Sequence, residues 1–248
     1  YIETPSNPNL AITDLKFRVE LGKNHQITTM VDNTFASPIN QNPSEYGIDV
    51  IIHSATKYLG GHSDLTAGAV CGSKEYIQKV WKRSLTLGGS LSPFDSWLLL
   101  RGLKTLAMRV KQINSNALQL AQWFEKHPAI KLVQYIGLAS HPQHQLANEQ
   151  MRGGTGMLCI EVIGDTDEIA HSNAQSILNK LTIFANAASL GGVESLVVHP
   201  ASMWGSHHNK TQKTASGITP GMLRISVGIE HIEDLIQDFN QALTGISA

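Results

Sequence analysis

A lysine, two hydroxyl residues and several glycines follow an apolar segment of the chain. Residues 51–64 read IIHSATKYLGGHSD, so Ser54, Thr56 and Lys57 come where a buried strand is expected to end. A lysine there is either solvated or partly desolvated, and desolvation lowers the pKa of its amine and makes it a nucleophile toward carbonyl groups. The two hydroxyls flank Ala55 and could converge on an anion. The stretch therefore predicts either a solvated strand terminus or the most reactive amine of the protein.

A carboxylate ends a second predicted strand. Asp32 follows the apolar residues of segment 27–35. In open parallel sheets ligands bind outside the carboxyl ends of the strands, so Asp32 and Lys57 are expected to share one crevice. An aldehyde cofactor with a phosphate and a basic ring nitrogen needs this set, because an amine binds the aldehyde, hydroxyls hold the phosphate and a carboxylate keeps the ring nitrogen protonated. Each residue alone has an ordinary structural explanation, but their joint occurrence favours the chemical one.

The elements that would position these residues alternate along the first hundred residues. Strands are predicted at 27–35, 48–57 and 66–73, and residues 10–24 have a helical period closed by a glycine. Strands rich in Ile and Val that alternate with helices are typical of the α/β class, with a mostly parallel sheet covered by helices.

A long apolar-periodic segment leads to a second unit. Pro93 suits a helix start and Pro128 an end, which predicts one helix from Pro93 to about Lys126. Beyond it, the patterns predict strands at 130–137, 156–163, 181–189 and 223–229 and helices at 166–181 and 232–243. We therefore expect two domains, residues 1–112 and 113–248, the second a smaller α/β unit. The long polar stretch 203–221 is expected to be a functional or mobile loop.

Composition and charge restrict the class of protein. The 248 residues are 42% hydrophobic and 16% charged, which is enough for one large core or two modest ones. A net charge of −1 without a basic run argues against nucleic acid or a membrane surface as partner. The sequence also has neither a membrane-span pattern nor a signal-peptide pattern. Cys71 and Cys159 lie in strand-like segments and are expected to be buried free thiols, so a cytoplasmic globular protein is predicted.

Five blocks of the sequence resemble one enzyme family. They are YIETPSNPN, VDNTFASP, HSATKYLGGHSDLTAG, SLGGVESLVVHPASM and LRISVGIEHIEDLIQD, and the resemblance extends over essentially the whole chain. These blocks are similar to those of the transsulfuration family of pyridoxal 5'-phosphate (PLP) enzymes, which includes cystathionine γ-synthases, γ-lyases and β-lyases, methionine γ-lyase and homoserine-ester sulfhydrylases. The resemblance implies PLP-dependent transferase fold type I, with part of a large domain, a smaller C-terminal domain, and a homo-oligomer that is a dimer of dimers.

The resemblance also implies which residues bind the cofactor. Lys57 matches the lysine that forms the Schiff base and transfers protons, and Asp32 matches the partner of the pyridine nitrogen. Ser54 and Thr56 match hydroxyls that bind the phosphate. Asn7, in SNP, matches an asparagine near the phenolic oxygen of the cofactor and the substrate.

Substrate residues follow from the same resemblance. Arg224, in LRIS, matches the arginine that binds the substrate α-carboxylate through its guanidinium fork, and Ser189, in SLGG, matches a residue lining the substrate site together with Asn7. The implied activity is elimination or replacement at Cγ of a sulfur amino acid or homoserine derivative, of the cystathionine γ-lyase or γ-synthase type. The β-lyase, methionine γ-lyase and sulfhydrylase reactions stay open as alternatives.

Three departures from the family bear on the activity. Ala188 stands where γ-synthases and many γ-lyases have a glutamate that binds the distal amino group of cystathionine, which brings methionine γ-lyase or sulfhydrylase chemistry closer. Trp204 replaces a frequent Thr-His pair and either caps the pocket or packs. Family members are longer at the N-terminus, so the remaining segment could act as a separate fragment. The alternative from another class is an inactive fragment or pseudo-enzyme subunit with an oligomerisation role.

Histidines offer a metal-dependent alternative. His53, His62 and Asp64 could suggest a zinc hydrolase, but they lack the compact spacing of a helical zinc site, and a glycine turn explains the last two. The pair at 141 and 144 resembles a family surface motif, and the pair at 207–208 is expected to lie in an exposed loop. No metal site is therefore predicted.

Overall fold

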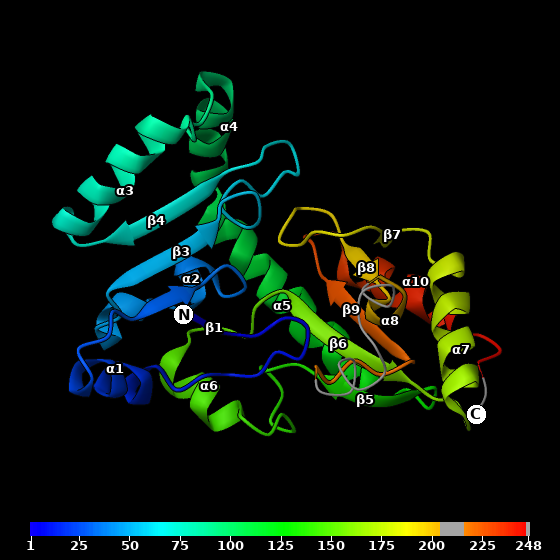
Figure 1. The fold of residues 1–248 in the computed structure, drawn as a ribbon. Coiled ribbons are helices and arrows are strands. Elements are labelled where there is room, and N and C mark those ends of the chain that lie inside the picture. Colours follow the sequence, from blue (N-terminus) through cyan, green and yellow to red (C-terminus); the bar gives the residue numbers. More distant parts are fainter. Residues whose placement is uncertain (204–215, 247–248) are drawn as a thin grey trace.

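The computed structural model describes residues 1–203 and 216–246, and it folds them into two lobes, each built on one β-sheet (Figure 1). Within these ranges the N-terminal sheet has four strands in the order β1-β2-β3-β4, and the C-terminal sheet has five in the order β5-β6-β9-β8-β7. Helix α5 (Leu106–Phe124) runs from one lobe to the other. The two lobes agree with the α/β class predicted from the sequence.

The N-terminal sheet brings polar strand ends to one edge. Its strands are β1 (Ile2–Glu3), β2 (Met30–Asp32), β3 (Val50–Ser54) and β4 (Gly68–Gly72). The first three are parallel neighbours and β4 pairs antiparallel with β3, so the predicted mostly parallel sheet is confirmed. Because parallel strands end at the same edge, Asp32 and Ser54 lie there together.

Helix α1 (Leu15–Asn24) is shorter than the predicted helix 10–24. The carboxylate of Asp14 accepts a hydrogen bond from the backbone N–H of Phe17 at 3.0 Å, so Asp14 is the N-cap and the residues before it are not helical. Gly22 lies inside the helix and does not end it. A Cβ there would come 2.6 Å from Cγ2 of Thr29, so this glycine allows close packing.

Helix α3 (Lys74–Leu87) was not predicted, although Ser73 caps it through the N–H of Tyr76. The helix buries none of its residues within the described chain, and Trp81, Leu85 and Leu87 are mostly exposed. Short helical segments α2 (Ser37–Asn40) and η1 (Pro43–Tyr46) precede it and connect β2 to β3.

The two cysteines differ in environment. Cys159 is buried as predicted, its Sγ lies 3.2 Å from the carbonyl oxygen of Pro8, and burial raises its pKa to about 12. Cys71 is exposed, so the prediction that it is buried is wrong. The reason is that Cys71 lies on β4, the edge strand of its sheet, and most of that strand is exposed.

The long helix predicted from Pro93 to Lys126 is two helices, α4 (Pro93–Leu103) and α5. Ser92 caps the start of α4 and Pro93 occupies its first turn, as the sequence indicated. The break follows because the N–H groups of Lys104 and Thr105 bond to the carbonyls three residues earlier, which tightens the last turn.

The C-terminal sheet is mostly antiparallel. Its strands are β5 (Ile130–Gln134), β6 (Met157–Val162), β7 (Ala185–Asn186), β8 (Leu196–Val198) and β9 (Met222–Ser226). Its helices are α6 (His144–Gln150), α7 (Asp167–Lys180), α8 (Pro200–Met203) and α10 (Ile232–Ala242). Only β7 and β8 pair in parallel. The predicted strand 181–189 shrinks to β7, and β8 and α6 were not predicted.

Helix α5 contributes to two hydrophobic cores. Leu106, Val110 and Ile113 pack into a cluster with residues of both lobes, and Ala117 to Phe124 pack into the cluster under the C-terminal sheet. The rings of Phe124 and Phe239 meet edge to face with centroids 4.8 Å apart, a favourable aromatic geometry. The change from one core to the other falls between Ile113 and Ala117.

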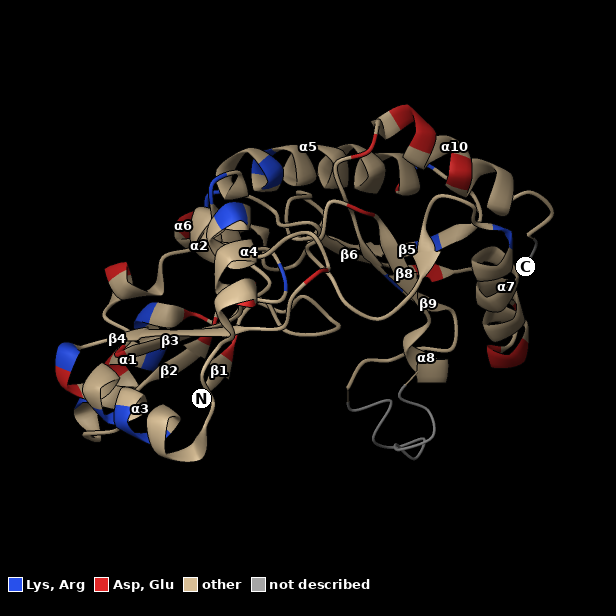
Figure 2. Ribbon diagram, turned by 90° about the horizontal axis from the view of Figure 1, so that it is seen from above, with Lys and Arg blue, Asp and Glu red and all other residues tan. Residues whose placement is uncertain are grey.

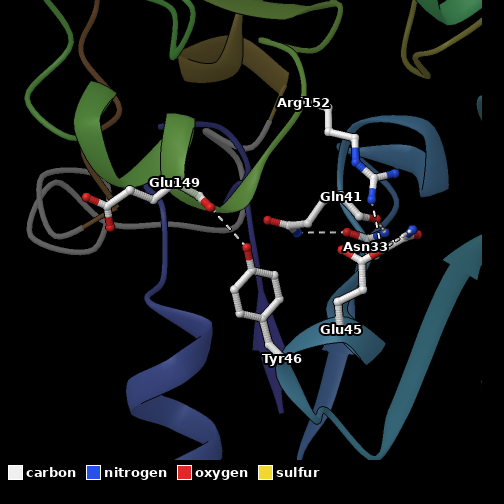
Figure 3. Close-up of polar contacts among 7 residues, drawn as sticks. Asn33, Gln41, Glu45, Tyr46, Glu149 and Arg152 are labelled. Carbon is white, nitrogen blue, oxygen red and sulfur yellow. Dashed lines mark hydrogen bonds and ion pairs between the residues drawn. The ribbon is translucent and has the colours of Figure 1, made fainter.

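Polar contacts join the N-terminal lobe to the region of α6 (Figure 3). The hydroxyl of Tyr46 donates to the carbonyl of Glu149 at 3.1 Å, and Arg152 forms an ion pair with Glu45 at 2.8 Å. Both contacts join residues more than 100 positions apart. They link α6 and the segment just after its end to η1 of the N-terminal lobe.

Charged residues are distributed over many elements (Figure 2). Lys and Arg lie on α1, α3, α4 and α5, and acidic residues gather at the start of α10. Among the described residues, the helices are all too short or too polar to cross a membrane.

Candidate active site

The ends of β2 and β3 are joined through one side chain. Asp32 accepts a hydrogen bond from the backbone N–H of Thr34 at 2.9 Å, and the hydroxyl oxygen of Thr34 accepts one from the backbone N–H of Ser54 at 2.8 Å. The hydroxyl of Tyr1 donates to the other carboxylate oxygen of Asp32 at 3.1 Å. A carboxylate has about four acceptor positions, so Asp32 can accept further bonds.

Lys57 lies on a turn directly after β3. The turn is held by hydrogen bonds from the N–H of Gly60 to the carbonyl of Ala55 and from the N–H of Gly61 to the carbonyl of Lys57, both at 2.8 Å. The side chain is half-buried, and its Nζ donates to Oγ of Ser189 at 2.8 Å. Desolvation lowers the pKa of Lys57, and the nearby positive charge of Arg224 adds to that effect. A lowered pKa raises the fraction of the amine that is neutral and nucleophilic at a given pH.

Ser189 has an unusual backbone conformation. Its φ is 129°, a region that residues other than glycine rarely adopt and that is found most often at functional sites. The loop after it packs tightly on the turn of Lys57, because Gly191 has a φ of 74° and a Cβ there would come 2.8 Å from the backbone nitrogen of Tyr58. The N–H of Gly191 also donates to Oγ of Ser226 on β9.

Arg224 and Asn7 complete this group of side chains. Arg224 lies on β9 and is buried, and its guanidinium donates to Oδ1 of Asn7 at 2.9 Å and to the backbone carbonyl of Ser189 at 3.3 Å. Burial lowers the pKa of Arg224, but a guanidinium stays charged in proteins. A buried, charged fork beside an amine is suited to binding a carboxylate.

A cavity of about 640 Å³ is lined by Thr56, Ala188 and Ser189, the last of which accepts the hydrogen bond from the Lys57 amine. The Thr56 hydroxyl is already engaged, because it donates to the carbonyl of Ala67 at 3.3 Å and accepts from the N–H of the same residue at 3.0 Å. Its single proton is directed at that carbonyl, so the hydroxyl would have to turn away from Ala67 to donate to a phosphate. Sequence reasoning missed the side chain of Thr34, which follows Asp32 by two residues and links the two strand ends.

The metal alternative finds no geometric support in the described part of the chain, which contains no group of three His, Cys, Asp or Glu side chains that could hold a metal ion. His53 is buried, and burial lowers its pKa. His141 is also buried, and Nδ1 of His144 lies 3.0 Å from the carbonyl oxygen of Ile136. Trp204 and the pair at 207–208 lie outside the described residues.

The fold is that of the PLP-dependent enzymes of fold type I. A solved structure of cystathionine gamma synthase from Xanthomonas oryzae, in complex with cystathionine, matches 98% of this chain with a TM-score of 0.92 and 43% identity, and the match covers 62% of that chain. The structure of cystathionine gamma-lyase from Lactobacillus plantarum complexed with L-serine matches with the same TM-score and 36% identity, over 98% of this chain and 63% of that one.

The chain belongs to the family of Cys/Met metabolism PLP-dependent enzymes, which it matches over residues 1–244. It is 47% identical over 98% of its length to a cystathionine beta-lyase from Coxiella burnetii, and 44% identical over 99% to a cystathionine gamma-lyase from Bacillus subtilis. It is 41% identical over 99% to an L-methionine gamma-lyase from Porphyromonas gingivalis. The chain spans 61–64% of the length of these curated relatives.

Proposed function

We propose that this chain is the part of a PLP-dependent enzyme that carries the reactive lysine and the substrate-binding arginine. The observation that carries the proposal is the convergence of Lys57, Ser189, Arg224 and Asn7, of which Ser189 also lines an open cavity. The chemistry of the donor set fits the cofactor, because a desolvated amine suits an aldehyde, a carboxylate suits a basic ring nitrogen, and hydroxyls suit a phosphate.

In this proposal Lys57 would hold the cofactor, Asp32 would pair with its ring nitrogen, and Ser54 and Thr56 would contact its phosphate, with Asn7 nearby. When bound, PLP supplies an electron sink for the negative charge that develops on the amino-acid substrate. The positions of Asp32 and Ser54 at neighbouring strand ends support this assignment, because ligands bind at that edge of an open sheet.

The remaining side chains would bind and orient the substrate. The guanidinium of Arg224 would bind the α-carboxylate and hold the amino acid against Lys57. Lys57 in its neutral form would remove the α-proton and return it at a neighbouring carbon. Ser189 accepts a hydrogen bond from the Lys57 amine and thereby orients it.

The reaction that we propose is elimination or replacement at Cγ of a sulfur amino acid or homoserine derivative, of the cystathionine γ-lyase or γ-synthase type. The β-lyase, methionine γ-lyase and sulfhydrylase reactions remain alternatives, since relatives with lyase activities of different kinds are similarly identical to this chain. Incubating the protein with cystathionine, methionine, cysteine and an activated homoserine ester, and identifying the keto acid or thioether produced, distinguishes these reactions.

Substitution of Lys57 tests the proposal directly. Lys57→Ala is expected to abolish turnover and the visible absorbance of bound PLP, whereas Lys104→Ala, at an exposed lysine at the end of α4, should retain both. Retention of absorbance and turnover in Lys57→Ala contradicts the assignment. A wild-type protein that stays colourless with added PLP and still self-associates would favour the alternative of an inactive subunit.

We also propose a homo-oligomer, a dimer of dimers, located in the cytoplasm. The exposed apolar side chains on α3 and α4, among them Trp81, Phe94 and Trp97, support association. The change of core within α5, between Ile113 and Ala117, falls within a few residues of the proposed domain boundary at 112/113. Light scattering on the purified protein tests the assembly, and a monomer at all concentrations argues against it.

A further inference from the structure

Arg109 is a buried cation on α5 whose contacts within the described chain are with uncharged oxygens. Its guanidinium donates to the backbone carbonyls of Tyr58 at 2.9 Å, Leu59 at 3.5 Å and Gly102 at 2.8 Å. Its Nε donates to the hydroxyl of Thr105 at 3.1 Å, and the residue is 5% exposed. A buried charge is costly unless hydrogen bonds satisfy it, so this arrangement requires a structural or functional reason.

Two of these carbonyls belong to the turn that carries Lys57. They lie at the end of the turn, where a helical segment leaves carbonyl groups without backbone donors. Arg109 provides those donors, and its positive charge is favourable next to carbonyl ends. The third carbonyl, from Gly102, lies at the end of α4, so one guanidinium joins the turn of Lys57 to the ends of two helices.

The packing around Arg109 leaves little room for the turn to move. A Cβ at Gly61 would overlap Nη1 of Arg109, and a Cβ at Gly102 would overlap the carbonyl oxygen of Gly60. The other side of the turn is held by a hydrogen bond from the N–H of Val193 to the carbonyl of Gly61 at 3.0 Å. The turn is therefore enclosed between α4, α5 and the loop that follows Ser189.

We propose that Arg109 is a positioning residue for Lys57, which fixes the turn after β3 so that the Lys57 amine reaches Ser189 and faces Arg224. Arg109 acts through the backbone and does not contact the amine. An arginine suits this role because its planar fork donates in several fixed directions, whereas the ammonium of a lysine is a point charge on a flexible stem. The inference rests on the proposed function of Lys57 as the reactive amine.

The test measures the Lys57 amine itself and does not depend on turnover. The whole chain, purified without added PLP, is treated with acetic anhydride over a range of pH, and acetylation of the Lys57 peptide is quantified by mass spectrometry. Only the neutral amine reacts, so the midpoint of the rate profile reports the pKa of Lys57. Thermal unfolding of each variant is recorded in parallel.

Arg109→Met is expected to shift the midpoint upward, toward the value of about 10.4 for a solvated lysine, because a loosened turn exposes the amine. Arg109→Lys should restore only part of the wild-type value. Gly61→Ala keeps the positive charge of Arg109 but displaces its guanidinium, so it should also shift the midpoint upward. This variant distinguishes an effect of the guanidinium's position from an effect of its charge. Arg101→Met, at an exposed arginine of α4, is the matched control and should leave the midpoint unchanged.

An unchanged midpoint in Arg109→Met and Gly61→Ala, with only a lower melting temperature, overturns the proposal and leaves Arg109 a merely structural residue. Should Arg109→Met fail to fold, Arg109→Lys and Gly61→Ala decide in the same way. If the proposed function is wrong, PLP added to the wild-type chain will not protect Lys57 from acetylation. This outcome is separate from the midpoints of the Arg109 variants.

Discussion

The Nζ atom of Lys57 lies 2.8 Å from Oγ of Ser189, although 132 positions separate the two residues in the chain. The first lies after a strand of the N-terminal sheet and the second follows β7 of the C-terminal sheet. The contact therefore exists only when both lobes are folded and docked. The left-handed φ of Ser189 indicates that its position is held at some conformational cost.

Removal of the Ser189 hydroxyl should slow turnover, and relief of the backbone strain at this position should raise the melting temperature. Ser189→Ala keeps the unfavourable φ and removes the acceptor, so we expect turnover to fall about tenfold, the value of one hydrogen bond to a charged group. Ser189→Gly removes the acceptor and also the strain. Its free energy of unfolding should therefore exceed that of Ser189→Ala by about 1 kcal/mol, and its melting temperature should be higher. Steady-state kinetics and thermal unfolding of the two variants test this, and equal melting temperatures would argue against strain at this residue.

Arg224 should act on substrate binding. In Arg224→Lys a point charge replaces the guanidinium fork, so we expect KM for the amino-acid substrate to rise about tenfold or more, with a smaller change in kcat. Arg152→Lys is the matched control, since its ion pair with Glu45 is exposed and contributes little. A change confined to kcat in Arg224→Lys would contradict a role in binding the α-carboxylate.

Lys57 should make the stability of the protein depend on pH in the alkaline range. Its pKa in the folded protein is lowered by desolvation, so it lies below the value of about 10.4 in the unfolded chain. Between these two values the unfolded chain binds more protons, and stability rises with pH. Below the folded-state pKa the penalty of burying the charged amine is fully present, so Lys57→Met should be more stable than the wild type at neutral pH.

Urea unfolding at several pH values measures this effect. The free energy of unfolding of the wild type should rise between neutral pH and pH of about 10, and that rise should be smaller in Lys57→Met. Lys104→Met, at an exposed lysine, should keep the wild-type slope. Identical slopes in all three proteins would mean that folding does not perturb the Lys57 amine.

The local signals of the sequence were sufficient for the sheet that carries Asp32 and Lys57. Strands β2 and β3 are short apolar segments in which Val31 and Val50 are buried, and polar residues follow both strands at the edge where open parallel sheets usually bind ligands. Helix α4 begins at the predicted proline for the same local reason, a cap followed by a residue that tolerates the first turn.

The predictions that were wrong or incomplete concern features that depend on contacts between distant parts of the chain. Cys71 was expected to be buried from its apolar neighbours, but exposure depends on the position of β4 at the sheet edge, which short-range pattern does not encode. At the break between α4 and α5, Gly102 approaches Gly60 closely and its carbonyl accepts a hydrogen bond from Arg109, contacts that a local pattern does not encode. The role of Thr34 likewise depends on the pairing of β2 with β3.

Asp238 should stabilise the C-terminal lobe as an anion. Its buried carboxylate accepts hydrogen bonds from the backbone N–H groups of Thr182, Ile183 and Phe184 and from the hydroxyl of Thr182. Desolvation raises the pKa of this carboxyl, but these bonds together hold it below its ordinary value. Asp238→Asn places an amide donor among these donors and should destabilise the fold by about 1.5–3 kcal/mol.

The pH dependence of that stabilisation has a definite sign. Because the folded-state pKa of Asp238 is lowered, its contribution is present above the unfolded value of about 3.9 and is lost as the pH falls through the folded value. The difference between the wild type and Asp238→Asn should therefore shrink in acid. Asp165→Asn, at an exposed aspartate, is the control and should match the wild type throughout. A difference that is constant with pH would contradict an anionic role.

Ala188 should influence the choice of substrate, because it lines the same cavity as Ser189 and Thr56. A glutamate there would add a negative charge beside Lys57 and could bind the distal ammonium group of cystathionine, whereas methionine has no such group. We expect Ala188→Glu to lower KM for cystathionine about tenfold, which corresponds to one charge-assisted hydrogen bond. KM for methionine should not fall. Ala188→Gln supplies similar volume without the charge and should not reproduce the effect. Equal changes for both substrates, measured as kcat/KM, would mean that position 188 does not contact the distal end of the substrate.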